Sequence, residues 1–359
     1  MLKHLNPLAE LRKSKVVKRA LPLMFSALLI ISQTSCSSNN IGSGSSIEPV
    51  SATEYDLLNT TCTITIYDMV NSDASKLISE SFELCREYEN LLSKTIEGSD
   101  IYKLNHSTED SVEVSDSTYE LLKKALYYGN LSEGRFDVSI GKLTNLWDFK
   151  TAPHVPAAED IEAALPTINY KDHVLIADHG PYVTKGHTDT EVDLGGIAKG
   201  YIADKVAGYL IEKDVEKAII NLGGNIVALG SKAEDTQWKI GIEKPYTDRR
   251  DIVGSIEVEN KTVVTSGVYE RCFQENGVLY HHILDPKTGY PCTSDVNSVT
   301  LVAPVGMSAD CDALSTICLM LGVEEGLKLI ESIDGIEASF IDLDGEIHLT
   351  SGMNFTPVE

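Results

Sequence analysis

The sequence predicts an α+β fold in which mixed or antiparallel sheets pack against helices. Runs with strand periodicity and segments with helical spacing follow one another without a regular strand–helix–strand alternation, which argues against a doubly wound parallel sheet. The chain has 359 residues, 42% of them hydrophobic, and no internal repeat. This is enough to bury a sizeable core. We therefore expect one large domain over residues 52–359.

The beginning of the chain predicts a targeting segment. A basic region over residues 3–19 precedes an apolar run over residues 20–31. As a helix this run would span only about 18 Å, short of the roughly 30 Å hydrocarbon core, so it fits a signal peptide better than a transmembrane anchor. Small residues precede Cys36 and a polar stretch follows it, which is typical of a bacterial lipoprotein processing site.

We expect residues 1–35 to be a lipoprotein-type signal peptide, Cys36 to carry the lipid, and residues 36–51 to be a flexible tether. The mature protein would then be exported and lipid-anchored to the outer face of the bacterial cytoplasmic membrane, or periplasmic. An ordinary secretory signal with an incidental cysteine is the alternative, because Gln33 stands where such sites usually have Leu.

The charge of the chain argues against nucleic acid as a partner. The sequence contains 30 Lys and Arg against 54 Asp and Glu, a net charge of −24, and removal of residues 1–35 leaves −29. Such a surface repels phosphate backbones. It would also repel an anionic nucleotide unless a metal ion or local cations offset the field. None of the seven cysteines forms a Cys-x-x-Cys pair, so zinc-ribbon and thioredoxin-like sites are excluded.

The first half of the domain predicts one strand and several helices. Alternation over residues 61–67 indicates a strand, and apolar residues at helical spacing indicate helices over 73–92 and 117–131. The segment 137–149 is also apolar at three-to-four spacing, but Gly141 interrupts it.

Beyond Pro166 short strands dominate, and two late helices precede a closing hairpin turned at Asp344-Gly345. The expected helices are 201–213, 308–321 and 323–333. The expected strands are 173–177, 189–194, 217–221, 225–229, 238–243, 252–258, 261–265, 278–284, 336–342 and 346–350.

A glycine-rich turn over residues 193–201 combines an acid, free backbone N–H groups and a cation. Asp193 ends a predicted strand, Gly195 and Gly196 allow a tight turn, and Lys199 lies close to the start of the following helix. Free N–H groups at a helix N-terminus together with a cation suit a phosphate. The pattern matches neither a Walker A loop nor a dinucleotide-binding fingerprint, and a purely structural turn is the alternative.

Two adjacent histidines supply candidate bases. On an extended strand His281 and His282 point to opposite faces, so only one of them can address a given site. A histidine is the natural general base near neutral pH. The Asp-Pro-Lys-Thr-Gly segment at 285–289 also fits the turn of a hairpin, and both interpretations can hold together.

The start of the predicted helix 308–321 carries two oxygen ligands. Asp312 and Thr316 are four residues apart and therefore share a helix face. A carboxylate and a hydroxyl suit Mg²⁺, with phosphate oxygens and waters completing its octahedron. Helix capping by Ser308 and Asp310 is the alternative explanation of the polar residues here.

Aromatic residues within 134–149 could sandwich a flat heterocycle, although Trp147 and Phe149 also suit an ordinary core. Taken together and in this order, these segments resemble the ApbE family of FAD:protein FMN transferases. The resemblance covers residues 52–356. Its matching segments are GRFDVSIGKLTNLWDF at 134–149 (with Lys142 where the family has Pro), DLGGIAKGY at 193–201, NLGGN at 221–225, SGVYER at 266–271, HHILDPKTG at 281–289 and CDALST at 311–316.

The resemblance implies a T-fold-like domain and places its functional residues. His282 is the implied catalytic base. The implied Mg²⁺ ligands are Asp312, Thr316, Ser315 and the main-chain carbonyl of Gly196. The implied flavin contacts are Arg135, Phe136, Asp137, Asp193, Lys199 and Ile283, together with Leu58 and Thr95, which stand where the family has other residues.

The activity that the resemblance implies is Mg²⁺-dependent transfer of FMN from FAD to a Thr or Ser hydroxyl of a target protein, with release of AMP. The implied target is a subunit of a membrane redox complex. One alternative is an Mg²⁺-dependent FAD pyrophosphatase, in which water replaces the hydroxyl and the products are FMN and AMP. Another is a non-catalytic flavin-binding lipoprotein, for which a metal-ligand pair would serve no purpose.

Overall fold

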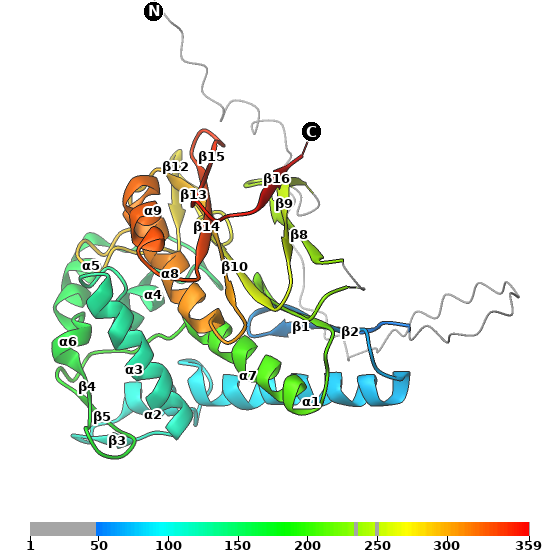
Figure 1. The fold of residues 1–359 in the computed structure, drawn as a ribbon. Helices are drawn as coiled ribbons and strands as arrows, with labels where there is room; N and C mark the ends of the chain where they lie inside the picture. The colour runs from blue at the N-terminus through cyan, green and yellow to red at the C-terminus, as the bar shows by residue number, and fades with distance from the viewer. Residues whose placement is uncertain (1–47, 233–235, 248–250, 359) are drawn as a thin grey trace, which may run out of the picture. The chain divides into compact units, whose positions relative to one another are not determined.

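An eight-stranded antiparallel sheet forms the centre of the fold (Figure 1). All of its neighbouring strands pair antiparallel. The order across the sheet is β1 (Val50–Leu57), β2 (Thr60–Ile66), β6 (Ala218–Leu222), β7 (Asn225–Leu229), β10 (Lys261–Gly267), β13 (Val296–Pro304), β14 (Glu337–Asp342) and β15 (Ile347–Leu349). The α+β prediction with antiparallel sheets is therefore confirmed.

The structure, a computed structural model, describes residues 48–232, 236–247 and 251–358. The predicted signal peptide, the predicted lipidation site Cys36 and most of the predicted tether lie outside these residues. Strand β1 begins at Val50, so regular structure starts within the last residues of the range predicted as a tether. Within the described part of the chain, none of the helices combines the length and the apolar character needed to cross a membrane.

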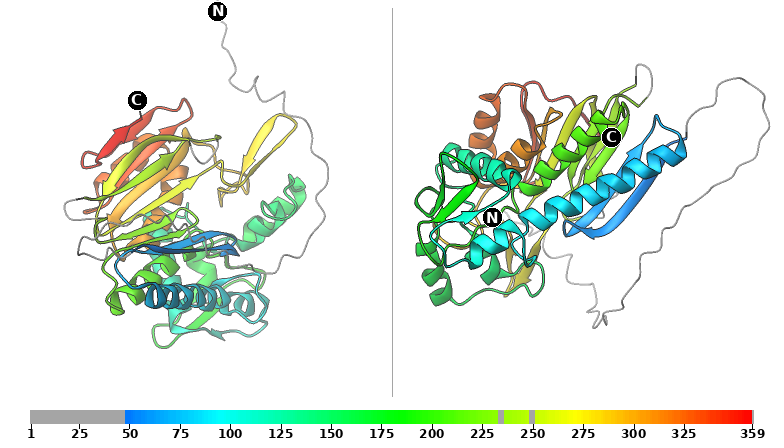
Figure 2. Two further views of the ribbon diagram at one scale, coloured as in Figure 1. Left: turned by 90° about the vertical axis from the view of Figure 1, so that its right-hand side faces the viewer. Right: turned by 90° about the horizontal axis from the view of Figure 1, so that it is seen from below.

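Alternating side chains give the large sheet two apolar faces. Val264 of β10 lies in the main core, whereas its neighbour Val263 belongs to a second cluster. The main core lies between the sheet and four helices, which Figure 2 shows along one side of it. These helices are α1 (Asn71–Leu92), α7 (Ala198–Glu212), α8 (Ser308–Leu321) and α9 (Val323–Glu331).

A smaller sheet covers the second face. It consists of β16 (Phe355–Pro357), β9 (Ile252–Val258) and β8 (Trp238–Glu243), in that order. Trp238 is buried there and packs with Tyr67 at a ring distance of 4.7 Å. The large sheet is thus a middle layer between helices and a second sheet.

The remaining elements lie in segments that connect these layers. Two of them matter for the site: α4 (Gly141–Trp147) and the separate hairpin of β11 (Cys272–Glu275) and β12 (Val278–His281). The others are α2 (Asp100–His106), α3 (Asp116–Leu131), α5 (Ala158–Ala164), the 3-10 turn Leu165–Thr167, α6 (Tyr170–His173), and the sheet of β3 (Val112–Glu113), β5 (Tyr182–Lys185) and β4 (Val174–Ile176).

The strand predicted over residues 189–194 is wrong. The backbone of Val192 bonds to the side-chain amide of Asn105, with N–H to Oδ1 at 2.7 Å and O to Nδ2 at 2.9 Å. The N–H of Asp193 donates to the carbonyl of Val138 at 2.8 Å. The side-chain amide of Asn105 thus bonds to the N–H and C=O groups of Val192 that would otherwise pair with a neighbouring strand. The segment is therefore not part of a sheet.

Candidate active site

The candidate site forms where the N-termini of α7 and α8 approach each other. A Cβ atom on Gly200 would lie only 2.2 Å from the carbonyl oxygen of Ser308, so glycine is required for this approach. The approach allows the N–H of Gly200 to donate to Oδ2 of Asp312 at 3.0 Å. Two segments more than a hundred residues apart in sequence therefore meet at one carboxylate.

The cap of α8 comes from another helix. Asp204 on α7 accepts hydrogen bonds from the N–H groups of Ser308 at 2.9 Å and Ala309 at 3.0 Å. Asp310 pairs instead with Lys124 at 2.6 Å and with the hydroxyl of Tyr128. Asp312 therefore takes no part in capping α8, and its side chain lies between the starts of α7 and α8.

Asp312 is a buried carboxyl group in polar surroundings. Only 2% of its surface is exposed, and its Oδ1 receives Nζ of Lys199 and Nδ2 of Asn225, each at 3.4 Å. The other amide atom, Oδ1 of Asn225, is buried and has no hydrogen-bond partner in the part of the chain that the structure describes. A buried oxygen without a donor is costly, so its position beside the carboxylate favours a ligand at this point.

The implied metal ligands surround this space. A Cβ on Gly196 would lie 3.7 Å from Oγ1 of Thr316 and 3.0 Å from the ring of Phe136, so the glycine turn passes close to both. Ser315 is fully buried, and its hydroxyl bonds to the carbonyl of Asp312 at 2.9 Å and to the hydroxyl of Ser266 at 2.8 Å. The donor set is made of oxygens alone, which fits a hard cation such as Mg²⁺.

Asp193 holds the glycine turn to the rest of the site. Its Oδ1 accepts the N–H of Gly195 at 2.8 Å, and its Oδ2 pairs with Lys94 at 2.9 Å and accepts the hydroxyl of Thr144 at 2.7 Å. Burial alone would raise the pKa of Asp193. The charge of Lys94 and these hydrogen bonds outweigh it, so the pKa lies below its usual value.

His282 directly follows β12 and is held as a neutral base. Its Nδ1 lies 3.2 Å from the carbonyl oxygen of Arg271, an atom that can only accept, so Nδ1 carries the proton. Nε2 is therefore the unprotonated nitrogen, and it has no hydrogen-bond partner among the described residues. Burial, together with the positive charges of Arg271 and His281 and, to a smaller extent, of Lys199, lowers the pKa of His282 to about 3.

The neighbouring histidine has a different role. Nε2 of His281 lies 3.1 Å from the carbonyl oxygen of Cys292, and burial lowers the pKa of this side chain. Its Nδ1 is buried and has no hydrogen-bond partner within residues 48–232, 236–247 and 251–358. The contact of His281 with Cys292 connects β12 with the segment after the Asp-Pro-Lys-Thr-Gly turn. His282, by contrast, is affected by the positive charge of Lys199.

Two of the implied flavin contacts, Asp137 and Arg135, also bond within the protein. Asp137 is buried and bonds to the backbone N–H groups of Ser139 at 2.8 Å and Tyr170 at 3.0 Å; burial raises its pKa. It therefore organises its own loop. Arg135 is partly exposed and donates to the carbonyl of Ser132 at 3.3 Å.

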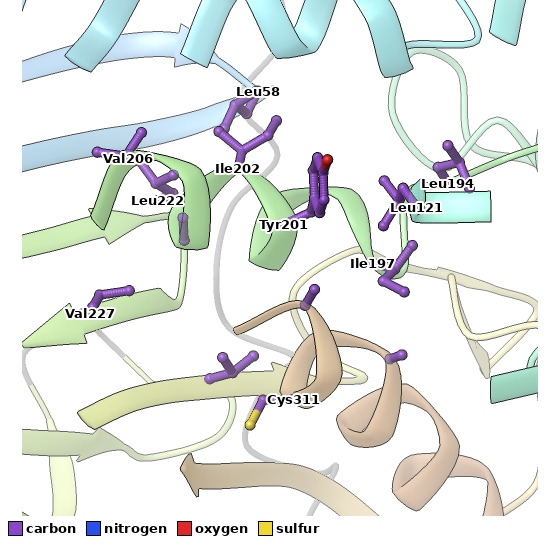
Figure 3. Packing of buried hydrophobic residues seen from close by; sticks show 14 of the residues in the cluster. Leu58, Leu121, Leu194, Ile197, Tyr201, Ile202, Val206, Leu222, Val227 and Cys311 are labelled. Atoms are coloured by element: carbon purple, nitrogen blue, oxygen red, sulfur yellow. The ribbon is translucent and has the colours of Figure 1, made fainter. Parts of the chain in front are cut away.

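The three remaining implied contacts differ in exposure. Leu58 is buried in the main core and points toward Ile202 of α7 in Figure 3. Thr95 is exposed, whereas Ile283 is buried beside the second histidine. The structure thus gathers Phe136, Asp193, Gly196, Lys199, Asp312 and Thr316 around the two helix starts.

Sequence reasoning missed two residues of the site. Lys94 lies in the loop after α1 and pairs with Asp193, and Asn225 on β7 touches Asp312. The Gly-Gly-Asn segment at 223–225 was a usable signal for the second. No spacing rule connects Lys94 with Asp193, which is 99 positions further along the sequence.

Comparisons with known proteins decide the family. The family model described as the ApbE family matches residues 58–340. The chain belongs to the ApbE family. A relative from Klebsiella pneumoniae (strain 342), named FAD:protein FMN transferase, is 37% identical over 287 residues, which is 79% of this chain and 88% of the relative. One of the same name from Treponema pallidum (strain Nichols) is 33% identical and covers 89% of this chain and 91% of the relative.

Solved ApbE structures share the fold. The crystal structure of the ApbE protein from Thermotoga maritima has a TM-score of 0.76 at 32% identity, covering 85% of this chain and 97% of that one. The flavin transferase ApbE from Vibrio cholerae has a TM-score of 0.75 at 31% identity with the same coverage. The predicted ApbE membership, the fold class and the enzyme class, a transferase, are therefore confirmed.

Proposed function

We propose that this ApbE protein transfers FMN from FAD to a Thr or Ser hydroxyl of a target protein and releases AMP. One arrangement carries the proposal. Lys199 pairs with the buried Asp312 at 3.4 Å and also acts electrostatically on His282, whose Nε2 is unprotonated. Lys199 therefore connects the carboxylate of the proposed Mg²⁺ and phosphate site electrostatically with the neutral base.

The residues around Asp312 fit a magnesium ion. Asp312, Thr316 and the carbonyl of Gly196 would hold it, and Ser315 would support Asp312 through the hydrogen bond to its carbonyl. Asn225, whose Oδ1 has no partner among the described residues, bonds to the same carboxylate through Nδ2. When bound, Mg²⁺ offsets the charge of the pyrophosphate and of the developing transition state. This neutralisation matters in a chain with a net charge of −24.

The donor dinucleotide would bind along the glycine turn. Its pyrophosphate would face Lys199 and the positive end of the helix dipole at the start of α7, a helix of 15 residues. Phe136, which approaches Gly196, would lie against the flavin part. Asp193, held in its ionised form by Lys94, fixes the turn on which these groups stand.

His282 would activate the acceptor. The acceptor hydroxyl gives its proton to Nε2 of His282, and its oxygen forms a bond to the phosphorus on the FMN side. The bond between that phosphorus and the bridging oxygen breaks, and this oxygen leaves with AMP, which takes up a proton from His282 or solvent. The Nδ1–H bond to the Arg271 carbonyl keeps the imidazole in the tautomer that this step requires.

We further propose that the enzyme works outside the cytoplasm. The basic region, apolar run and Cys36 of the sequence support a lipid-anchored protein at the outer face of the cytoplasmic membrane. Its partner would be a subunit of a membrane redox complex that exposes a flavinylation site on that side. Metabolic labelling with a palmitate analogue, with Cys36→Ser as the control, tests the anchor.

The test of the function is incubation with FAD, Mg²⁺ and a peptide that contains one threonine, followed by intact-mass measurement. Addition of one FMN to the peptide together with release of AMP supports the transferase. Free FMN and AMP without any modified peptide would instead support the pyrophosphatase. FAD that binds and remains intact would leave only a binding protein.

A further inference from the structure

The hairpin of β11 and β12 is a separate two-stranded sheet next to the proposed base. Asn276 and Gly277, both with positive φ, form its two-residue turn. In the left view of Figure 2 the hairpin, in yellow, stands apart from the large sheet. Its second strand ends at His281, so His282 is the first residue beyond it.

One face of the hairpin is anchored by aromatic rings. Phe273 and Tyr280 face each other across the strands with ring centroids 5.4 Å apart. Both contact Trp147, and Phe273 also lies 5.6 Å from Phe149. Trp147 is fully buried and donates to the carbonyl of Gly289 at 2.8 Å, so this face of the hairpin packs against a fixed side chain.

The outer edge of β12 has free backbone groups. The N–H of His282 donates to the carbonyl of Arg271, so alternate residues of β12 bond to β11 and Leu279 and His281 direct their N–H and C=O groups outward. No partner for these outward groups is found among the described residues. Val278 and Leu279 are 51% and 42% exposed, which is unusual for apolar residues on a strand edge.

This open edge ends beside the base. Beyond His281 the same edge is covered, because the N–H of Cys292 donates to the carbonyl of Ile283 at 2.8 Å. A strand added along Leu279 and His281 cannot continue past this point and must leave the sheet at the level of His282. From Leu279 to His282 the distance along the strand is about 10 Å, three residues of extended chain.

We propose that an extended segment of the acceptor protein docks as a third strand on the outer edge of β12 and is thereby led to His282. The inference rests on the proposed function, because that reaction requires a polypeptide hydroxyl at Nε2 of His282. Backbone pairing supplies affinity with little demand on sequence, and the exposed side chains of Val278 and Leu279 supply the apolar contacts.

The first test removes one outward donor. Leu279→Pro deletes an N–H that does not bond to β11, and Gln274→Pro makes the matched change on the outer edge of β11. The assay is FMN transfer to the single-threonine peptide, with FAD affinity and FAD cleavage by water measured alongside. We expect Leu279→Pro to lower kcat/KM for the peptide about tenfold, with FAD affinity and cleavage by water unchanged, and Gln274→Pro to have little effect.

The second test uses the unmodified enzyme. Single N-methyl groups are placed in turn on the backbone amides of the peptide around its threonine. Strand addition predicts that every second position reduces transfer, because alternate amides face β12. Equal transfer by wild type and Leu279→Pro, a loss confined to Gln274→Pro, or a scan without period two would each overturn the docking proposal. No transfer by the wild type to any peptide would overturn the proposed function and this inference with it.

Discussion

Replacement of His282 by Asn separates catalysis from folding more cleanly than any other change at the site. The ring of His282 donates to the carbonyl of Arg271, but the backbone N–H of residue 282 also donates to this carbonyl, at 3.1 Å. The carbonyl therefore keeps one donor after the substitution. His281→Asn is the matched control, because His281 lies one position away and its ring binds the carbonyl of Cys292 instead.

The expected loss follows from the role of Nε2. A positioned general base contributes about 10² to 10⁴ in rate, or about 2.7 to 5.5 kcal/mol of transition-state stabilisation. His282→Asn should therefore reduce single-turnover transfer by at least about a hundredfold and leave the FAD dissociation constant within about threefold. His281→Asn should change the transfer rate only slightly.

The pH profile provides a second measurement. With a pKa of about 3, His282 stays unprotonated at pH 5 to 8, whereas an ordinary histidine would be roughly three-quarters protonated at pH 6. Since kcat/KM reports the free enzyme, it should show no inflection near pH 6.5. The unfolded chain binds this proton more readily, so stability should fall as pH drops from about 6.5 towards 3, and less so in His282→Asn.

Three outcomes would refute this reasoning. One is full transfer activity in His282→Asn. Another is a larger loss in His281→Asn, which would mean that the base lies on the opposite face of the strand. The third is an inflection of kcat/KM near pH 6.5 that disappears in His282→Asn.

Three further changes test other parts of the site. Asp312→Asn keeps an acceptor for the Gly200 N–H but removes the charge, so Mg²⁺-dependent turnover should fall at least about a hundredfold in a magnesium titration; unchanged turnover at low Mg²⁺ would contradict the metal assignment. Lys94→Met should raise the pKa of Asp193 and weaken FAD binding about tenfold, most at acid pH, and Lys94→Arg should restore the affinity measured by flavin fluorescence. Trp147→Ala should cost about 3–5 kcal/mol of unfolding free energy in urea denaturation, and a cost near zero would show that the aromatic anchor is unimportant.

Elements with strong periodicity could be predicted from the sequence. The helices expected over 73–92 and 117–131 are α1 and α3 within two residues at each end, because amphipathic spacing and caps are local properties. Strand β13, an interior strand of the large sheet, was not predicted. Its first eight residues are buried on both faces, and Asn297, Ser298 and Thr300 interrupt its apolar run, so neither alternation nor a continuous apolar segment marks it.

The contacts of the candidate site likewise fall into those that local sequence spacing predicts and those that it does not. The pairing of Asp312 with Thr316 follows from helical spacing, and the opposite directions of His281 and His282 follow from the pleat of a strand. The contact of Lys94 with Asp193 and the orphaned amide of Asn225 come from segments far apart in the sequence. A side chain's partner across the fold cannot be inferred from local pattern.

By itself the sequence determined the family, the class of fold and the residue types available for the chemistry, because these depend on composition, order and local spacing. Only the tertiary structure decided which histidine is held as a free base, that Asp204 caps α8 and leaves Asp312 for a ligand, and that one edge of β12 is open beside the site. The physical reason is that hydrogen-bond satisfaction and burial are properties of pairs of groups, and the fold alone decides which groups meet.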